Sequence, residues 1–290
     1  MVVNESYGEK IFKYFNIIFL GILGLIMLLP IITVTATSFS SALAVDAGKV
    51  SLWPVDFTLA SWREILAKSE MWRAFFLNIF VTVVGTFLAL MTTSLMAYPM
   101  AKKEFKPAKI LSIMVVITMV FKAPIIPYFL ALKNMGLYNN IFVLIVPHLV
   151  VPYNLIIMRT FFKQIPLELE EAAKVEGSNY FQILFKIILP MSKASLATVG
   201  LFYAVMIWNQ FMHPMLFIQD EALFPLQLRL RQYISVGEDL SSGLYGGIKP
   251  FNERTLKAAT VIFTVVPILC VYPFLQKYFV KGAMLGSVKG

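Results

Sequence analysis

The sequence has few charged residues for its length. Only 14% of its 290 residues are charged and 59% are hydrophobic, whereas a soluble domain is about 25% charged and about 45–50% apolar. Polar side chains this scarce cannot cover a soluble fold of this size, but the apolar majority can face lipid. The composition therefore predicts a membrane protein.

Residues that build metal and catalytic sites are also nearly absent. There is one cysteine, Cys270, which excludes an intrachain disulfide or a cysteine metal site. The two histidines, His148 and His213, have no metal-ligand spacing, and no nucleophile or phosphate-loop motif is present. We therefore predict no catalytic residue, no metal and no cofactor in this chain.

Six apolar windows are long enough to span a bilayer, which takes about 20 residues. They cover residues 17–37, 75–98, 110–130, 141–158, 194–218 and 258–276. Lipid offers no partner for backbone N–H and C=O groups, so each window should be helical. The sequence thus predicts an all-α membrane protein with six transmembrane helices.

The first window could instead be a signal peptide. Lys10 and Lys13 precede it, and Ala42-Leu43-Ala44 resembles a cleavage site. However, the apolar run exceeds the 7–15 residues of a usual signal core, and the cleavage-like sequence lies well beyond its end. A retained helix is favoured.

The net charge is +9, and basic residues in cytoplasmic loops account for it because they set membrane topology. Lysines and arginines gather in the loop after the second window, in residues 159–193 and in the tail, and the loop after the third window carries only Lys133. The positive-inside rule then places both termini in the cytoplasm and segments 38–74 and 219–257 outside. No basic patch is interleaved with aromatics as nucleic-acid binding would need. We expect one transmembrane domain over residues 1–290, with a core of about 75–276.

The absence of acidic residues from all six windows argues against a proton-coupled carrier, which places carboxylates in the membrane. Because the chain also lacks a phosphate-cradling loop, the energy for any pumping should come from another subunit.

The cytoplasmic segment 159–193 predicts a short helix. Pro166 suits its first turn, Gly177 can adopt the left-handed conformation that ends it, and Asn179 with Gln182 resembles a cap for the next helix. Such a helix could rest on lipid headgroups, or Ala172 and Ala173 could let another protein approach closely.

A fixed pattern in this segment favours the second alternative. It matches the EAA-loop signature of ABC-importer permeases at Glu171, Ala172, Ala173, Gly177, Ile187, Leu189 and Pro190. The segments 52–62, 78–98, 208–218 and 225–227 and the tail 281–290 also resemble these proteins. The chain is similar to the binding-protein-dependent carbohydrate permeases with the type I importer fold, on the side of the second, MalG-like subunit.

This resemblance implies that the short helix docks in a cleft of a cytoplasmic ATPase, with Glu171 as the polar contact, Ala172 and Ala173 as the packing surface and Gly177 as the turn. The implied partners are a second permease, two ATPases that hold ATP and Mg, and an extracytoplasmic binding protein that docks on segment 219–257. ATP-driven closure would rock the membrane helices about a site near mid-membrane.

Polar residues inside the windows are the candidates for the substrate path. They are Lys122, Asn154, Tyr203, Trp208, Asn209 and Gln210. A buried charge such as Lys122 should face protein or water, unless the third span ends early and Lys122 anchors it at the interface. For the others, the alternative is hydrogen bonding between helices, and His148 and His213 are expected to be structural.

The substrate expected from the resemblance is an oligosaccharide. Lys122, with Arg229 and Arg231 outside, would suit an acidic one of the alginate type. Two other classes stay open: an ABC permease for a non-sugar solute, and a secondary transporter without an ATPase partner.

Overall fold

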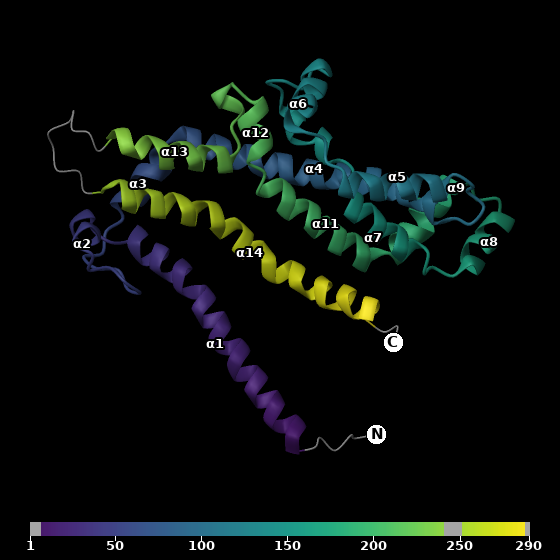
Figure 1. The fold of residues 1–290 in the computed structure, drawn as a ribbon, viewed down its shortest axis with the longest axis horizontal. Coiled ribbons are helices and arrows are strands. Elements are labelled where there is room, and N and C mark those ends of the chain that lie inside the picture. Colours follow the sequence, from purple (N-terminus) through teal and green to yellow (C-terminus); the bar gives the residue numbers. More distant parts are fainter. Residues whose placement is uncertain (1–6, 241–250, 288–290) are drawn as a thin grey trace. The chain divides into compact units, whose positions relative to one another are not determined.

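The structure is a computed structural model that describes residues 7–240 and 251–287, and every regular element in these ranges is a helix (Figure 1). Contacts divide the chain into two compact units. Unit 1 comprises Met1–Ser69 and Leu230–Val266, and unit 2 comprises Glu70–Arg229 and Pro267–Gly290. The prediction of one transmembrane domain over the whole chain stays a prediction.

Unit 1 is built from long helices and a folded connecting segment. Its helices are α1 (Tyr7–Ser38), α2 (Ala42–Asp46), α3 (Ala60–Ala67), most of α13 (Leu226–Leu240) and the first part of α14 (Glu253–Ser287). Phe39 stacks between Phe57 and Trp62, with ring centroids 5.6 and 5.4 Å away. The Ser61 hydroxyl donates to that of Thr255 at 2.9 Å, so α3 is tied to α14.

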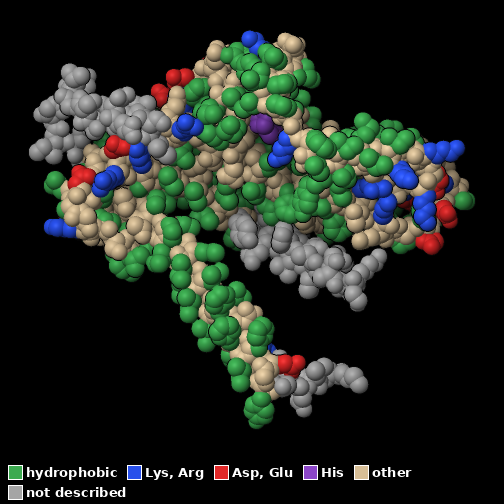
Figure 2. Space-filling model, in the orientation of Figure 1, with side chains coloured by type: hydrophobic (Ala, Val, Ile, Leu, Met, Phe, Trp, Pro, Cys, Tyr) green, Lys and Arg blue, Asp and Glu red, His purple; other side chains and the backbone are tan. Residues whose placement is uncertain are grey.

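Helix α1 exposes apolar side chains all round. Its Ile, Leu and Phe side chains between residues 11 and 32 are between 40% and 70% exposed, and hydrophobic side chains cover its visible face in Figure 2. A helix of 32 residues is about 48 Å long at 1.5 Å per residue, more than the hydrocarbon thickness of a bilayer. It is therefore a membrane-facing helix, as predicted for residues 17–37.

Unit 2 holds most of the remaining helices around two cores. They are α4 (Ser69–Ala101), α5 (Ala108–Val120), α6 (Ile125–Asn134), η1 (Ile141–Leu144), η2 (Val146–His148), α7 (Pro152–Phe162), α8 (Leu167–Val175), α9 (Tyr180–Ile183), the π-turn η3 (Leu184–Ile188), α10 (Leu189–Met191), α11 (Lys193–Trp208), α12 (Met212–Phe217) and η4 (Glu221–Leu223). One core joins the C-terminal half of α4 to α7, α8, η3 and α11. The other joins its N-terminal half to α6, η1 and α12.

Small residues let α4 and α11 approach closely. A Cβ added at Gly85 would lie 3.0 Å from Ile207, and one added at Gly200 would lie 3.1 Å from Leu90. Small residues at crossing points are how membrane helices pack, because lipid gives no hydrophobic drive for association. Gly85 and Gly200 thus mark two points where α4 and α11 approach closely.

Three of the six predicted windows lie in long continuous helices, α1, α4 and α14. Among the described residues, two more candidate spans are bent helix pairs: η1–η2 with α7, bent by 46°, and α9–α10 with α11, bent by 86°. The fifth window is not one helix to residue 218, since α11 ends at Trp208 and α12 begins at Met212.

The third window, residues 110–130, is also not one helix. Helix α5 ends at Val120 and α6 begins at Ile125, with Phe121 extended at ψ 100°. Pro124 causes the break, because it lacks an N–H group and disfavours helical geometry in the residue before it. Pro127 lies in the first turn of α6, where a missing N–H leaves no bond unmade.

Candidate functional site

Helix α8 has the ends that the sequence predicted. Pro166 precedes its first residue, and Gly177 has φ +83°. The N–H of Gly177 donates to Lys174 O at 3.0 Å, and that of Ser178 donates to Ala173 O at 2.9 Å, which is the Schellman pattern. The capping box between Asn179 and Gln182 is present. These predictions are confirmed, and they make α8 a short helix with both ends fixed.

The inner face of α8 packs against other helices of unit 2. Glu170 is 3% exposed, pairs with Lys102 and accepts a hydrogen bond of 3.3 Å from the Tyr98 hydroxyl. The Lys102 ammonium also lies 4.5 Å from the Tyr98 ring centroid. Ala173, one turn along, is buried in the core that α4, α7 and α11 share. Movement of α8 would therefore move the end of α4.

The outer face of α8 is free within the described residues. Glu171 and Ala172 are exposed, and Val175 is 90% exposed. This separates the two alanines that we expected to form one docking surface. Ala172 faces outward, whereas Ala173 packs inward, because residues at i and i+3 such as Glu170 and Ala173 share a helix face and their neighbours do not.

The later positions of the motif lie in the helix that leads to α11. Ile187 and Leu189 are half-buried against the same core as Ala173, and Pro190 is exposed in α10. Ile187 and Leu189 thus serve the packing behind α8. Gly177 is exposed, and its positive φ supports its predicted part as the turn.

A polar cluster at the other core of unit 2 brings together two histidines that we expected to be structural and a predicted substrate-path residue, Gln210. The rings of His148 and His213 are 4.6 Å apart, and His213 Nε2 is 2.8 Å from the Tyr128 hydroxyl. The Gln210 side chain lies beside His148. Pro147 precedes His148, and Pro214 follows His213. The two His–Pro pairs were visible in the sequence, but the sequence did not show that the two histidines contact each other.

Several buried polar atoms of unit 2 lack a hydrogen-bond partner among the described residues. They are Asn78 Oδ1, His148 Nε2, Trp208 Nε1 and Gln210 Oε1. The Asn78 amide reaches the Trp208 carbonyl at 3.4 Å, and the Gln210 amide reaches Leu144 O at 3.3 Å. Most buried polar groups in folded proteins are paired. These atoms could hydrogen-bond a hydroxyl-rich ligand or ordered water.

The predicted substrate-path residues do not form one site. Tyr203 is fully buried, with its hydroxyl 2.6 Å from the Thr93 hydroxyl, and it accepts a bond from Val151 N at 3.0 Å. It therefore connects helices, which is the alternative stated above. Asn154 is buried in α7, and the exposed Asn209 donates to Val205 O at 2.8 Å and caps α11. Of these residues, only Gln210 lies beside a histidine of the cluster.

Lys122 lies in the non-helical break between α5 and α6, and no described contact joins it to the cluster. It is exposed, and Val120, Phe121 and Ile126 around it are also exposed. A lysine among apolar side chains at membrane depth needs a polar partner or water. None of the described residues forms an ion pair with Lys122 in the structure.

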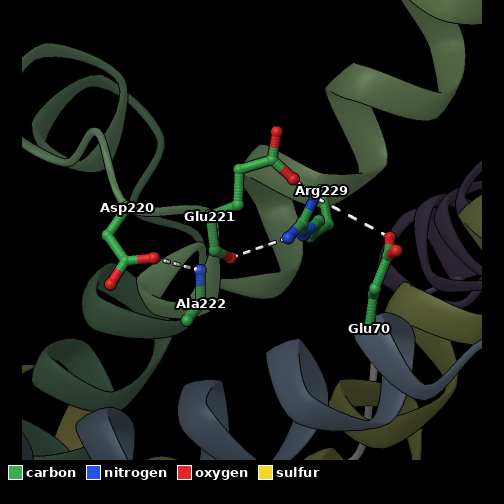
Figure 3. A network of polar contacts seen from close by, with 5 residues as sticks. All are labelled: Glu70, Asp220, Glu221, Ala222 and Arg229. Carbon is green, nitrogen blue, oxygen red and sulfur yellow. Dashed lines mark hydrogen bonds and ion pairs between the residues drawn. The ribbon is translucent and has the colours of Figure 1, made fainter.

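Arg229 is buried and paired, which differs from the expectation that it faces an acidic sugar. It is 6% exposed, and its guanidinium donates to Glu221 Oε2 at 2.8 Å and to Glu221 O at 2.7 Å, with Glu70 Oε2 at 3.9 Å (Figure 3). Asp220 caps the same turn by accepting from Ala222 N at 2.8 Å. Arg229 thus ties the segment after α12 to the start of α4. Arg231 is exposed.

The Arg229→Met variant should loosen this turn. Hydrogen bonds to charged groups contribute about 1.5–3 kcal/mol each, so amide hydrogen exchange in residues 219–225 should accelerate by about tenfold or more. Arg63→Met, which removes an exposed arginine in unit 1, is the matched control and should leave that exchange rate unchanged. Equal exchange in both variants would contradict the role given to Arg229.

No group of three His, Cys, Asp or Glu side chains that could hold a metal ion occurs among the described residues.

Comparison with known proteins decides the family. The family model described as "Binding-protein-dependent transport system inner membrane component" matches residues 65–284. The chain belongs to this family. It is a multi-pass membrane permease, a transport subunit and not a catalytic one, and the resemblance read from segment 159–193 is confirmed.

Relatives with similar sequences come from Bacillus subtilis (strain 168). Protein LplC is 40% identical over 99% of this chain and 98% of its own length. The polygalacturonan/rhamnogalacturonan transport system permease protein YtcP is 40% identical over 94% of this chain and 96% of its own. The family match and these relatives thus span nearly the whole sequence.

Two solved structures share the permease fold. One is a crystal structure of a bacterial ABC transporter involved in the import of the acidic polysaccharide alginate, with a TM-score of 0.85 and 32% identity over 95% of this chain and 99% of that chain. The other, a bacterial alginate ABC transporter in complex with an alginate pentasaccharide-bound periplasmic protein, has a TM-score of 0.57 at 14% identity over 93% of this chain and 96% of that chain. The second supports the fold alone.

Proposed function

We propose that this chain is a permease subunit of an ATP-driven importer that moves an acidic oligosaccharide from a binding protein into the cytoplasm. Helix α8 supports the proposed coupling to an ATPase, because one of its faces is packed and the other is exposed. Its inner face is tied to α4 through Glu170 and Lys102, and its outer face presents Glu171, Ala172 and Val175. A partner that grips the outer face can therefore displace the membrane helices.

The proposed topology has six spans with both termini in the cytoplasm. The spans are α1, α4, the broken pair α5–α6, the bent pair ending in α7, α11 with its preceding bend, and α14. Lysines and arginines gather where α5 begins and α8 lies (Figure 2), and the positive-inside rule supports placing that end in the cytoplasm. The Arg229 turn then lies outside. The tail signature ends at residues 288–290, which fall outside the described residues.

The proposed partners follow from the same arrangement. Two ATPases would hold ATP and Mg and grip α8, because this sequence has no phosphate-binding loop. A second, related permease would complete the pathway. An extracytoplasmic binding protein would dock on segment 219–257, of which residues 241–250 lie outside the described residues.

The acidic substrate rests on relatives and on one side chain. Polygalacturonan and alginate, named for a relative and for a similar transporter, are both polymers of uronic acids. Lys122 is a cation without a described ion-pair partner at membrane depth. A carboxylate of the oligosaccharide would serve as the anionic partner of Lys122. The unpartnered polar groups would bind sugar hydroxyls; they belong to Asn78, His148, Trp208 and Gln210.

Reconstitution tests this function. The complete transporter in liposomes should show ATP hydrolysis that rises with binding protein loaded with oligogalacturonate or oligoalginate, and rises little with neutral maltooligosaccharides of equal length. Stimulation by neutral sugars alone would reject the acidic substrate. Stimulation only by a non-sugar solute would reject the oligosaccharide altogether, and uptake that needs no ATP would reject the importer.

The Lys122→Ala variant should lower the transport of acidic oligosaccharides selectively. A hydrogen bond to a charged group contributes about 1.5–3 kcal/mol, so uptake at low substrate should fall about 10- to 100-fold. Lys122→Arg keeps the charge and should retain most of the uptake. If Lys122→Ala transports acidic oligosaccharides as well as the original chain does, Lys122 is an interfacial anchor.

A further inference from the structure

A basic hollow of about 680 Å³ lies beside α5, where the α4–α5 connection meets the end of α7 and the start of α8. Six cationic side chains line it: Lys102, Lys103, Lys106, Lys109, Arg159 and Lys163. The only acidic residue in its lining is Glu170, which pairs with Lys102. The hollow therefore carries an excess of about five positive charges.

The remaining cations have no carboxylate partner among the described residues. Lys103, Lys106, Lys109 and Lys163 are exposed, and none of them forms a described ion pair. Arg159 is held in place because its Nε donates to Met100 O at 2.8 Å. Basic residues that only set topology need to lie on one side of the membrane, but nothing in that rule gathers them around one hollow. This hollow is built to receive an anion.

One wall of the hollow is apolar and continues along a membrane helix. Helix α5 lines it with Lys109, Ser112, Ile113, Val116 and Ile117, a spacing of three and four residues that marks one helix face. Ile113, Val116 and Ile117 are about half exposed. From Lys109 to Ile117 the helix rises about 12 Å, so the charged rim is followed by an apolar track that runs into the bilayer.

We propose that this hollow binds the headgroup of an anionic phospholipid, with an acyl chain along Ile113, Val116 and Ile117. A basic rim with an apolar track is complementary to a lipid of this class, and basic pockets at the cytoplasmic ends of membrane helices recognise such headgroups. A soluble anion would leave the apolar wall uncovered. The lipid would border the Lys102–Glu170 contact, so it would stabilise the junction between α8 and α4.

Native mass spectrometry of the complete purified transporter, titrated with palmitoyl-oleoyl phosphatidylglycerol or the matching phosphatidylcholine, tests the proposal. We expect one phosphatidylglycerol retained preferentially. Lys106→Gln with Lys109→Gln should weaken its binding about 30-fold, since each lysine contributes about 1 kcal/mol near an anionic lipid. The matched control is Lys186→Gln with Lys193→Gln, two exposed lysines of segment 159–193 outside the hollow, and it should bind as the original does.

Each other outcome overturns the proposal. If the transporter shows no preference for phosphatidylglycerol, or if both double variants lose binding equally, the lysines attract anionic lipid without forming a specific binding site. Displacement of the lipid by inorganic phosphate at equal concentration would mean a site for a free anion. If the Lys106→Gln, Lys109→Gln variant loses the ATPase subunits but binds lipid as the original does, the hollow is an interface with another protein. If the double variant does not assemble, Lys163→Gln on the opposite wall should weaken binding about fivefold, and no weakening would reject the site.

This test does not depend on which solute is carried. A transporter that moves neutral sugars would fail the acidic-substrate test above and could still retain the lipid. Loss of lipid selectivity with transport of oligogalacturonate intact would reject only the lipid site.

Discussion

Replacing Glu171 by lysine should abolish the coupling of ATP hydrolysis to transport, lowering substrate-stimulated ATP hydrolysis by about 30-fold or more. Glu171 is exposed on the outer face of α8 beside Ala172. A contact at the centre of an interface contributes about 2 kcal/mol or more, and the reversed charge adds repulsion wherever the partner complements the glutamate. The measurement is ATP hydrolysis by the reconstituted transporter with loaded binding protein.

The control for this prediction is Glu176→Lys, which makes the same charge change at the C-terminal end of the same helix. A lysine at a helix C-terminus is favourable to the helix dipole, so this variant should fold and retain most of its stimulated activity. Both variants should remain in the membrane at the level of the original chain, since exposed substitutions change stability little. A Glu171→Lys transporter with full stimulated hydrolysis would refute the assignment of this face as the coupling surface.

Removing Lys102 should destabilise the protein more than any other substitution predicted here. Lys102→Ala would leave Glu170, which is 3% exposed, without its ion-pair partner. Breaking a buried pair in this way costs about 3–5 kcal/mol. The thermal unfolding midpoint of the detergent-purified transporter should therefore fall, and α8 should become accessible to proteases.

Two further variants separate this pair from a general effect of charge. Lys103→Ala, at the exposed neighbouring position, should change the stability by less than about 0.5 kcal/mol. Lys102→Met with Glu170→Leu replaces both charges by apolar groups and should recover most of the loss, because such replacements are often neutral or stabilising. A double variant as unstable as Lys102→Ala would show that the ion pair is not what holds α8.

Local sequence signals predicted the helices and their ends well. The ends of α8 and the capping box of α9 depend on residues within one turn of each other, namely Pro166, Gly177, Asn179 and Gln182. Local chemistry of this kind is the same whatever packs around it. Hydropathy also located α1, α4 and α14. It failed at residues 110–130, 141–158 and 194–218, because apolar length alone does not show where a helix breaks.

The sequence predicted which residues form the motif of the candidate site, but not which of them are exposed or buried. The pattern from Glu171 to Pro190 predicted the family, but it gave Ala172 and Ala173 the same role. The structure buries Ala173 and exposes Ala172. It also pairs Arg229 with Glu221, which lie on different helices. The hydroxyls of Tyr203 and Thr93, which are far apart in the sequence, contact each other as well.

The amino-acid sequence by itself determined that this is a helical membrane permease, because apolar runs, proline positions and the motif in segment 159–193 act over short stretches of chain. The tertiary structure alone decided which side of each helix is free. It brought His148 to His213, Lys102 to Glu170, and six cations around one hollow. Such meetings depend on how helices distant in sequence pack, and no local propensity encodes which residues a neighbouring helix will cover.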